Sequence, residues 1–236
     1  MANTYFDFKQ FRIDQDLCAM KVCTDSCILG AYVNPDGVSQ ILDIGTGTGL
    51  LALMLAQKTN ARIDAVEIDT DAAGQAAMNA KNSPWNDRIS IYNESIQNFA
   101  RRMNKQYDFI ISNPPFYSNY LQSSKDSINV AYHSKFLSFD ELLDSVAKLL
   151  KPTGVFTCLL PAQASEEFID KARKRNLYLN EKLEVRDNLS SPVFRVILTF
   201  THQPSDNISI KELVIKNGNS YSESFSNLLK PYYLHL

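Results

Sequence analysis

Hydrophobic residues along the chain fall into short, almost unbroken runs separated by longer segments of helical periodicity. Such runs are typical of strands that are buried on both faces of a sheet. They comprise residues 41–44, 63–68, 89–92, 109–112 and 155–160. Strands of this kind need helices on both faces of the sheet to cover them.

Helical patterns occupy most of the intervals between these runs. The predicted helices are Leu50–Lys58, Asp71–Lys81, Ile96–Met103, Phe139–Leu150 and 164–175. The fourth is preceded by Ser138, which stands three residues before Glu141 at the spacing of a capping box. Because strands that alternate with helices form right-handed crossovers, the pattern predicts a doubly wound α/β fold around a mostly parallel sheet.

The C-terminal part of the chain breaks this alternation. Residues 177–185 and 193–202 are two long strand patterns without an intervening helix, which predicts an antiparallel edge, and 209–216 is one more strand candidate. There is no internal repeat and no low-complexity linker. We therefore expect a single domain over residues 1–236, with 1–35 as an N-terminal extension.

Composition by itself indicates little about the function of the protein. Apolar residues make up 44% of the chain, charged residues 21%, and the net charge is −2, which is typical of a globular protein. No apolar run reaches the length of a membrane span, so we expect a cytoplasmic protein. The cysteines lack C-x-x-C spacing and the histidines are scattered singly, so no metal site or disulfide framework is expected.

The segment LDIGTGTGLL connects the first predicted strand to the first predicted helix. Gly45, Gly47 and Gly49 allow a tight turn and let a ligand approach the backbone closely. A dinucleotide fingerprint counted from Gly45 needs its last glycine where this chain has Leu50. The loop therefore departs from the dinucleotide-binding pattern.

Two carboxylates near this loop indicate the ligand. Asp43 would repel a pyrophosphate but suits the amino group of an amino-acid moiety. Glu67 ends the next strand about twenty residues after the glycines, where an acidic side chain can accept ribose hydroxyls. A ligand with a ribose, an amino-acid end and no phosphate is S-adenosylmethionine.

The sequence Asn113-Pro114-Pro115-Phe116 follows the predicted strand 109–112. The prolines have no N–H to give a sheet, so the strand must stop there. At the ligand crevice of a doubly wound sheet, Asn113 is expected to stand next to the sulfonium methyl and so to contact the cofactor as well as the substrate. Its side-chain oxygen and the Pro114 carbonyl can each accept one N–H of an exocyclic amine. Phe116 adds a ring on which a planar base can stack. We interpret the turn as an amine clamp.

The NPPF and DIGTGTG motifs resemble those of class I S-adenosylmethionine-dependent amino-methyltransferases, which act on adenine N6, guanine N2 or glutamine amides. The resemblance implies a Rossmann-like fold with a mostly parallel seven-stranded sheet and an antiparallel edge. Glutamine-modifying members usually carry tyrosine as the fourth residue, so Phe116 favours the members that act on RNA bases.

The two ends of the chain narrow this resemblance. FDFKQFRIDQDLCAMKVCTDSCILGAYV, residues 6–33, and GNSYSESFSNLLKPYYLHL, residues 218–236, resemble the bacterial tRNA(Val) (adenine-37) N6-methyltransferase family. The likeness spans nearly the whole chain. It implies a monomeric cytoplasmic enzyme that methylates the adenine just 3′ of a tRNA anticodon.

The N-terminal extension and the third strand supply further cofactor candidates. KVCTDSCILGA is expected to enter a helix capped near Thr24 or Asp25 and to close over the cofactor, with Lys21 as a third contact. Methyltransferases often have an acidic residue after the third strand that reaches the adenine amine. Here Ser95 occupies that position and Glu94 precedes it.

RNA contacts are expected from aromatic and basic residues. Phe8 and Phe11 flank Lys9, a mixture suited to stacking and phosphate contact, although core packing of the phenylalanines is an equal alternative. Two basic clusters are further candidates, although such clusters are commonly solvated helix faces. They contain Arg101, Arg102, Lys105, Arg173, Lys174 and Arg175.

The motifs leave other functions open. A glutamine-amide N5 methyltransferase acting on a protein would use the same clamp, and so would an enzyme for another RNA base, such as one in rRNA. A silent cofactor-binding RNA chaperone is a third class, against which the intact Asp43, Glu67 and Asn113 argue. The chain has no readable code for one tRNA or one adenine, because folded RNA is recognised through shape and scattered basic residues.

Overall fold

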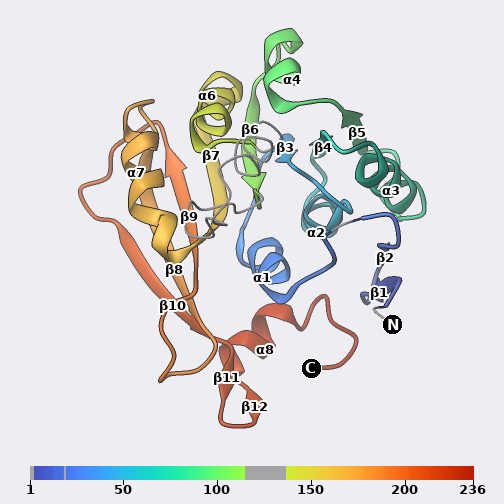
Figure 1. Ribbon diagram of the computed structural model, residues 1–236, viewed down its shortest axis with the longest axis vertical. Coiled ribbons are helices and arrows are strands. Elements are labelled where there is room, and N and C mark those ends of the chain that lie inside the picture. The colour runs from blue at the N-terminus through green and yellow to red at the C-terminus, as the bar shows by residue number, and fades with distance from the viewer. Residues whose placement is uncertain (1–2, 19, 115–136) are drawn as a thin grey trace, which may run out of the picture.

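A computed structural model describes the chain over residues 3–18, 20–114 and 137–236. Over these residues, a central sheet of eight strands is covered by helices on both faces (Figure 1). The strands lie in the order β10 (Ser209–Val214), β8 (Tyr178–Arg186), β9 (Arg195–Thr201), β7 (Leu150–Pro161), β6 (Tyr107–Ser112), β3 (Gln40–Ile44), β4 (Arg62–Glu67) and β5 (Ile89–Asn93).

The sheet is mostly parallel, as the sequence predicts. Only β9 among these eight strands runs against its neighbours, β7 and β8. The number of strands and the position of the antiparallel strand differ from the expectation of seven strands with an antiparallel edge. The antiparallel strand lies inside the sheet, and the extra strand β10 takes the edge by pairing in parallel with β8. The predicted strand 209–216 therefore becomes the eighth strand.

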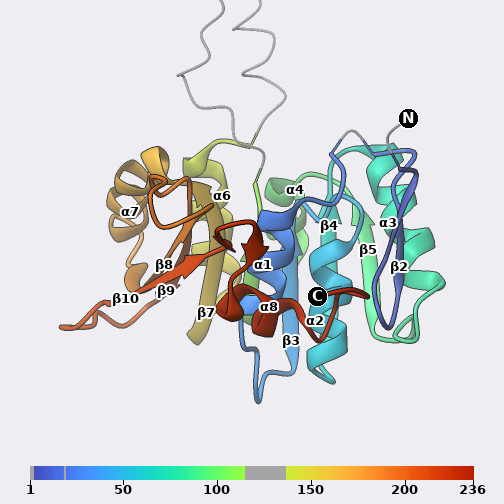
Figure 2. The same cartoon turned by 90° about the horizontal axis from the view of Figure 1, so that it is seen from below.

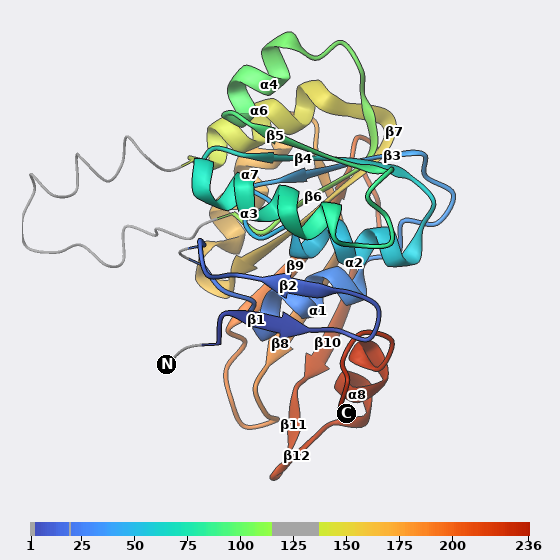
Figure 3. The same ribbon diagram turned by 90° about the vertical axis from the view of Figure 1, so that its right-hand side faces the viewer.

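Helices cover each face of the sheet. The helices are α1 (Thr24–Tyr32), α2 (Leu50–Lys58), α3 (Thr70–Lys81), α4 (Ile96–Arg102), α6 (Phe139–Leu149), α7 (Ser165–Arg173) and α8 (Glu223–Leu229), with a short 3-10 turn at Ala162–Ala164. In Figure 3, α4 and α6 lie above the strands, and α1, α2 and α3 lie below.

Alternation along each strand assigns its side chains to one of two hydrophobic cores. On β3, Ile41 packs in the core that includes α1 and α2, whereas Leu42 packs in the core that includes α4, α6 and α7. On β6, Ile111 and Ile110 divide in the same way. The next residue with the orientation of Ile111 is Asn113, so its side chain is directed toward α1.

The two ends of the chain lie side by side. The strands β1 (Tyr5–Asp7) and β2 (Arg12–Asp14) form an N-terminal hairpin, and in the loop between them the Lys9 N–H donates to the Tyr232 carbonyl at 2.8 Å. The C-terminal region adds the short hairpin β11 (Lys216–Asn217) with β12 (Ser220–Tyr221), and then α8, which packs beside α1 (Figure 2). The segments that carry the family resemblance thus meet in the fold.

The described residues contain neither a membrane-spanning helix nor a candidate metal site. None of their helices is long and apolar enough to cross a membrane. They also contain no group of three or more histidine, cysteine, aspartate or glutamate side chains arranged to hold a metal ion.

Candidate active site

Three parallel strands end together at the carboxyl edge of the sheet. Ile44 of β3 pairs with Val66 of β4 on one side and with Ser112 of β6 on the other. The glycine loop, Glu67 and Asn113 therefore lie at one level. The helix that follows β3, α2, covers one face, and the next described helix after β6, α6, covers the other. This makes the edge between β3 and β6 the point where doubly wound sheets bind ligands.

The glycine loop joins β3 to α2 in a backbone conformation that needs glycine. Gly45, Gly47 and Gly49 have φ values of 72°, 56° and 83°, which side chains rarely tolerate. The Gly45 N–H donates to the Val66 carbonyl at 2.9 Å, which fixes the loop to β4. A methyl group added at Gly45 or Gly47 would meet no atom within 4 Å. The loop backbone therefore borders open space.

Asp43 lies beneath this loop and is fully buried. Its Oδ2 accepts the Thr46 hydroxyl at 2.6 Å, while its Oδ1 has no partner among the described residues. Burial raises the pKa of Asp43 to about 7, and the nearby Glu67 adds to the increase against the opposing effect of the Thr46 hydrogen bond. A buried acceptor without a partner is costly. The site therefore suits a cationic amino group.

Glu67 is the second carboxylate at this edge. Its Oε2 accepts the Gly47 N–H at 2.9 Å and its Oε1 accepts the Asp69 N–H at 3.0 Å. Ile68 lies beside it and is 64% exposed, which the sequence analysis missed. An apolar residue between two acidic ones after a strand was the available signal. An apolar side chain next to the predicted ribose acceptor can pack against a nucleoside base.

Ser95, predicted to contact adenine, has a structural role in this fold. It is the N-cap of α4, and its hydroxyl accepts the Asn98 N–H at 3.2 Å. The sequence analysis did not single out Asn93, whose Nδ2 donates to the Glu67 carbonyl at 3.0 Å and to the Ile68 carbonyl at 3.2 Å. Asn93 thus ties the end of β5 to the Glu67 segment, and the adenine contact of Ser95 stays a prediction.

Asn113 follows β6 and is directed toward α1. Its Nδ2 donates to the Ser26 hydroxyl at 2.7 Å, and its Oδ1 is buried without a partner among the described residues. Pro114 is buried next to it, whereas the predicted catalytic residues Pro115 and Phe116 lie outside the described residues. The edge of the sheet therefore holds two unpartnered buried oxygens, one on Asp43 and one on Asn113.

Comparison with known proteins agrees with this arrangement. The methyltransferase small domain family matches residues 18–160. A relative from Dyadobacter fermentans, named tRNA1(Val) (adenine(37)-N6)-methyltransferase, is 43% identical over 98% of each chain. The chain belongs to this family.

Solved structures show the same fold at low sequence identity. A protein from Agrobacterium tumefaciens described as a predicted O-methyltransferase superposes with a TM-score of 0.65 at 13% identity, covering 87% of this chain and 95% of that one. A candidate class I S-adenosylmethionine-dependent methyltransferase from Listeria monocytogenes gives a TM-score of 0.60 at 14% identity, covering 92% and 70%. The class I methyltransferase fold predicted from the sequence is confirmed.

Residues at the start of α1 lie near the site but are tied to other parts of the chain. Cys23, rather than Thr24 or Asp25, is the N-cap of α1, and its side chain makes no capping bond. The Lys21 ammonium donates to the Asn3 carbonyl at 3.1 Å. Thr24 is exposed. The Asp25 Oδ2 accepts from Arg195 Nε at 2.9 Å. Cofactor contacts by Lys21, Thr24 and Asp25 stay predictions.

The N-terminal phenylalanines belong to the core, so the expectation that they stack on RNA is corrected here. Phe8 is 4% exposed and Phe11 is 7% exposed, and their rings stack on each other at 4.5 Å between centroids. Phe8 also lies 6.0 Å from the Tyr233 ring of the C-terminal segment. Lys9 is exposed, and its ammonium donates to the Lys230 carbonyl at 2.7 Å. Core packing, the alternative interpretation, explains both phenylalanines.

The first basic cluster comprises the end of α4 and the segment that leads into β6. Arg102 Nε donates to Glu94 at 3.0 Å, and Arg101 donates to Asn98. Lys105 pairs with Asp64. Glu94 directly follows β5, whose last residue pairs with Glu67 at the carboxyl edge of the sheet, so Arg102 reaches back to that edge. Phosphate contact by these residues stays a prediction.

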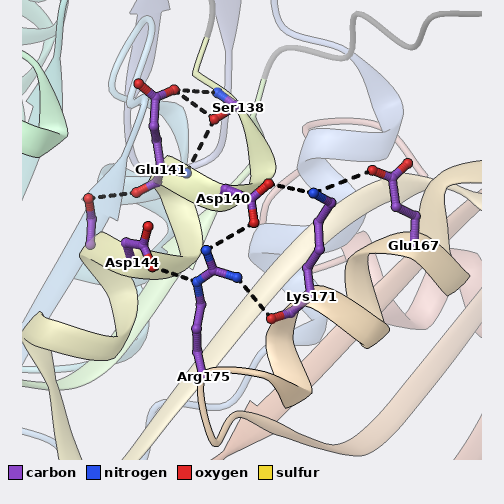
Figure 4. Close-up of polar contacts among 8 residues, drawn as sticks. Ser138, Asp140, Glu141, Asp144, Glu167, Lys171 and Arg175 are labelled. Atoms are coloured by element: carbon purple, nitrogen blue, oxygen red, sulfur yellow. Dashed lines mark hydrogen bonds and ion pairs between the residues drawn. The ribbon is translucent and has the colours of Figure 1, made fainter.

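The second basic cluster lies between α6 and α7. Arg175 bonds Asp140 at 2.9 Å and Asp144 at 2.6 Å, and Lys171 pairs with Asp140 (Figure 4). In the same view Ser138 and Glu141 form the predicted capping box at the start of α6. Arg175 therefore links two helices, whereas Arg173 and Lys174 are exposed and available to a partner.

Proposed function

We propose that the protein transfers a methyl group from S-adenosylmethionine to the exocyclic N6 of adenine 37 in tRNA1(Val). The buried, unpartnered Oδ1 of Asn113 is the observation that carries the proposal. An acceptor that is withdrawn from water and has no partner needs a donor, and an exocyclic amine supplies one. The names of relatives such as the one from Dyadobacter fermentans identify that amine as adenine N6.

The residues around the glycine loop fit the cofactor. Asp43 Oδ1 would accept from the amino group of its amino-acid end, and Glu67 would accept from the ribose hydroxyls. Gly45 and Gly47 leave open space for it against the loop backbone. When bound, S-adenosylmethionine supplies a methyl group that is activated by a sulfonium. The chain then has to orient the nucleophile and exclude water.

The clamp would compensate for the weak nucleophilicity of the substrate amine. The lone pair of adenine N6 is delocalised into the ring, so the nitrogen must move toward tetrahedral geometry to attack. Asn113 Oδ1 and the Pro114 carbonyl would each accept one N–H, which directs the lone pair at the methyl group. The clamp contributes only when both acceptors face the amine.

The proposed target also fits the size of the chain. A base inside a duplex must be flipped out, at a cost of a few kcal/mol. An adenine in an anticodon loop is already unpaired and needs only unstacking.

We further propose that the enzyme works in the cytoplasm as a monomer.

Transfer of a labelled methyl group from S-adenosylmethionine tests the class of substrate. The purified protein is incubated with bulk tRNA or with bulk protein, and Asn113→Ala serves as the matched control. We expect label in tRNA with the parent protein and little with Asn113→Ala. Label in protein but not in tRNA would favour the glutamine-amide alternative, and no label in either would contradict the proposal.

A further inference from the structure

The side chain of Asn113 is held at one end only. Its Nδ2 donates to Ser26 Oγ at 2.7 Å, and its Oδ1 has no partner among the described residues. An amide has a donor at one end and an acceptor at the other. The end that Ser26 binds therefore decides which end is left for a substrate. An amine substrate carries N–H donors and needs to meet the oxygen.

We infer that Ser26 is a positioning residue, whose hydroxyl holds the Nδ2 of Asn113 and so keeps Oδ1 turned toward the substrate amine. This inference deepens the proposed function and rests on it. Ser26 does not contact the reacting atoms and acts through Asn113. Its own position is well protected, since it is 6% exposed in the first turn of α1.

The Ser26 hydroxyl has a second hydrogen-bond neighbour. Ser26 Oγ lies 3.0 Å from Cys23 Sγ, and either atom can donate in this contact. Burial raises the pKa of the Cys23 thiol, so the sulfur carries its hydrogen. When the serine hydroxyl donates to that sulfur, its oxygen is left to accept from Asn113 Nδ2, which lies 2.7 Å away.

Hydrogen bonds hold the backbone near both Ser26 and Asn113 in place. Asp25 accepts the Ser26 N–H at 3.2 Å through one oxygen and Arg195 Nε at 2.9 Å through the other, which fixes the start of α1 to the start of β9. At the end of β6, the Ser112 hydroxyl donates to the Ile44 carbonyl at 2.9 Å. The asparagine is thus placed by two elements whose separation is fixed.

Two substitutions of equal size test the role of the hydroxyl. Ser26→Thr keeps it and Ser26→Val replaces it with a methyl group, so both share any strain from the added carbon. We expect the kcat of Ser26→Val to fall about tenfold below that of Ser26→Thr, the size of effect expected for one lost hydrogen bond. The KM for S-adenosylmethionine should be the same in both. Ser26→Ala, compared with the parent, gives the same test without added volume.

Ser145 offers a matched control. It is a buried serine on α6 whose hydroxyl donates to the Glu141 carbonyl at 2.8 Å, away from the cleft. Ser145→Thr and Ser145→Val should have equal kcat values. A tenfold difference between them would show that losing any buried helix hydroxyl has this effect, and would overturn the inference.

Combination with Asn113→Ala separates positioning from a general structural role. If Ser26 acts through Asn113, Ser26→Val should lower kcat no further in the Asn113→Ala background. If the parent methylates tRNA but Ser26→Thr and Ser26→Val have equal kcat values, the inference alone is overturned. It is also overturned if Ser26→Val lowers kcat as much in the Asn113→Ala background as in the parent background. A parent that methylates no tRNA overturns the proposed function, and the inference falls with it.

Discussion

Glu67 accepts the backbone N–H of Gly47 at 2.9 Å, so the acidic residue at the end of β4 holds the glycine loop at the end of β3. Replacing Glu67 by alanine removes the acceptor for the loop and the proposed acceptor for the ribose together. We expect affinity for S-adenosylmethionine to weaken by about 1–3 kcal/mol, the usual cost of leaving polar partners unpaired. Glu67→Gln keeps one oxygen and should lose less. Unchanged affinity of Glu67→Ala in titration calorimetry would move the ribose site elsewhere, with Asp69 as the next candidate.

Asp43 should make cofactor binding depend on pH. Its pKa in the ligand-free protein is raised to about 7, and the cationic amino group needs the ionised carboxylate. Affinity should therefore decrease as pH falls below 7, approaching about tenfold per pH unit. Asp43→Asn should bind more weakly and without this slope. Calorimetry between pH 5.5 and 8.5 measures it, and equal slopes for the two proteins would contradict the assignment.

The same pKa shift has a consequence for stability. Because the folded-state pKa of Asp43 lies above the ordinary value of 3.8, the folded state binds this proton more tightly than the unfolded state. Its contribution to stability is full below pH 3.8 and is lost as pH rises to about 7. Ligand-free Asp43→Asn should melt above the parent protein, by a margin that widens from pH 5 to 7 and then levels off. A margin that does not change with pH would contradict the shift.

Asn113→Ala tests the clamp kinetically. Loss of one positioned hydrogen-bonding group should lower kcat by about 100-fold or more. The affinity for S-adenosylmethionine should largely survive, because the other predicted contacts Asp43 and Glu67 are held by bonds that do not involve Asn113. Single-turnover rates and calorimetry on the same preparation separate these effects. A parent-like rate would show that the clamp assignment is wrong.

The exposed basic residues near α6 should contribute to tRNA affinity. Arg173 and Lys174 are exposed, and each phosphate contact adds about 0.7–0.9 to the slope of log affinity against log salt. Arg173→Ala with Lys174→Ala should make that slope shallower. Arg101→Ala with Arg102→Ala tests the other cluster in the same way, although Arg102 is already paired with Glu94. An unchanged slope in both would place the RNA path elsewhere. Lys135, a further candidate, lies outside the described residues.

Local signals in the sequence predicted most elements well. Leu50–Lys58 forms a helix with the bounds expected, because a glycine turn starts it and its residues are almost all apolar. Ser138 and Glu141 form the capping box for an equally local reason. The loop glycines, Asp43 and Glu67 could be predicted because their spacing reflects the end of a strand.

Features that depend on distant partners could not be predicted in this way. Ser26 contacts Asn113 across 87 positions of sequence, and no spacing rule covers that distance. Phe8 is buried because Tyr233 from the other end of the chain packs near it, so its alternation with basic residues was misleading. The place of β9 inside the sheet likewise depends on β8 and β10 pairing beyond it.

Nucleoside mass spectrometry of purified valine tRNA tests the central claim most directly. The tRNA is taken from cells that lack the gene and carry either the parent protein or Asn113→Ala. We predict that N6-methyladenosine at position 37 is absent without the gene, returns with the parent protein, and stays absent or nearly so with Asn113→Ala. Position 37 methylated to the same extent in cells with and without the gene would contradict the claim.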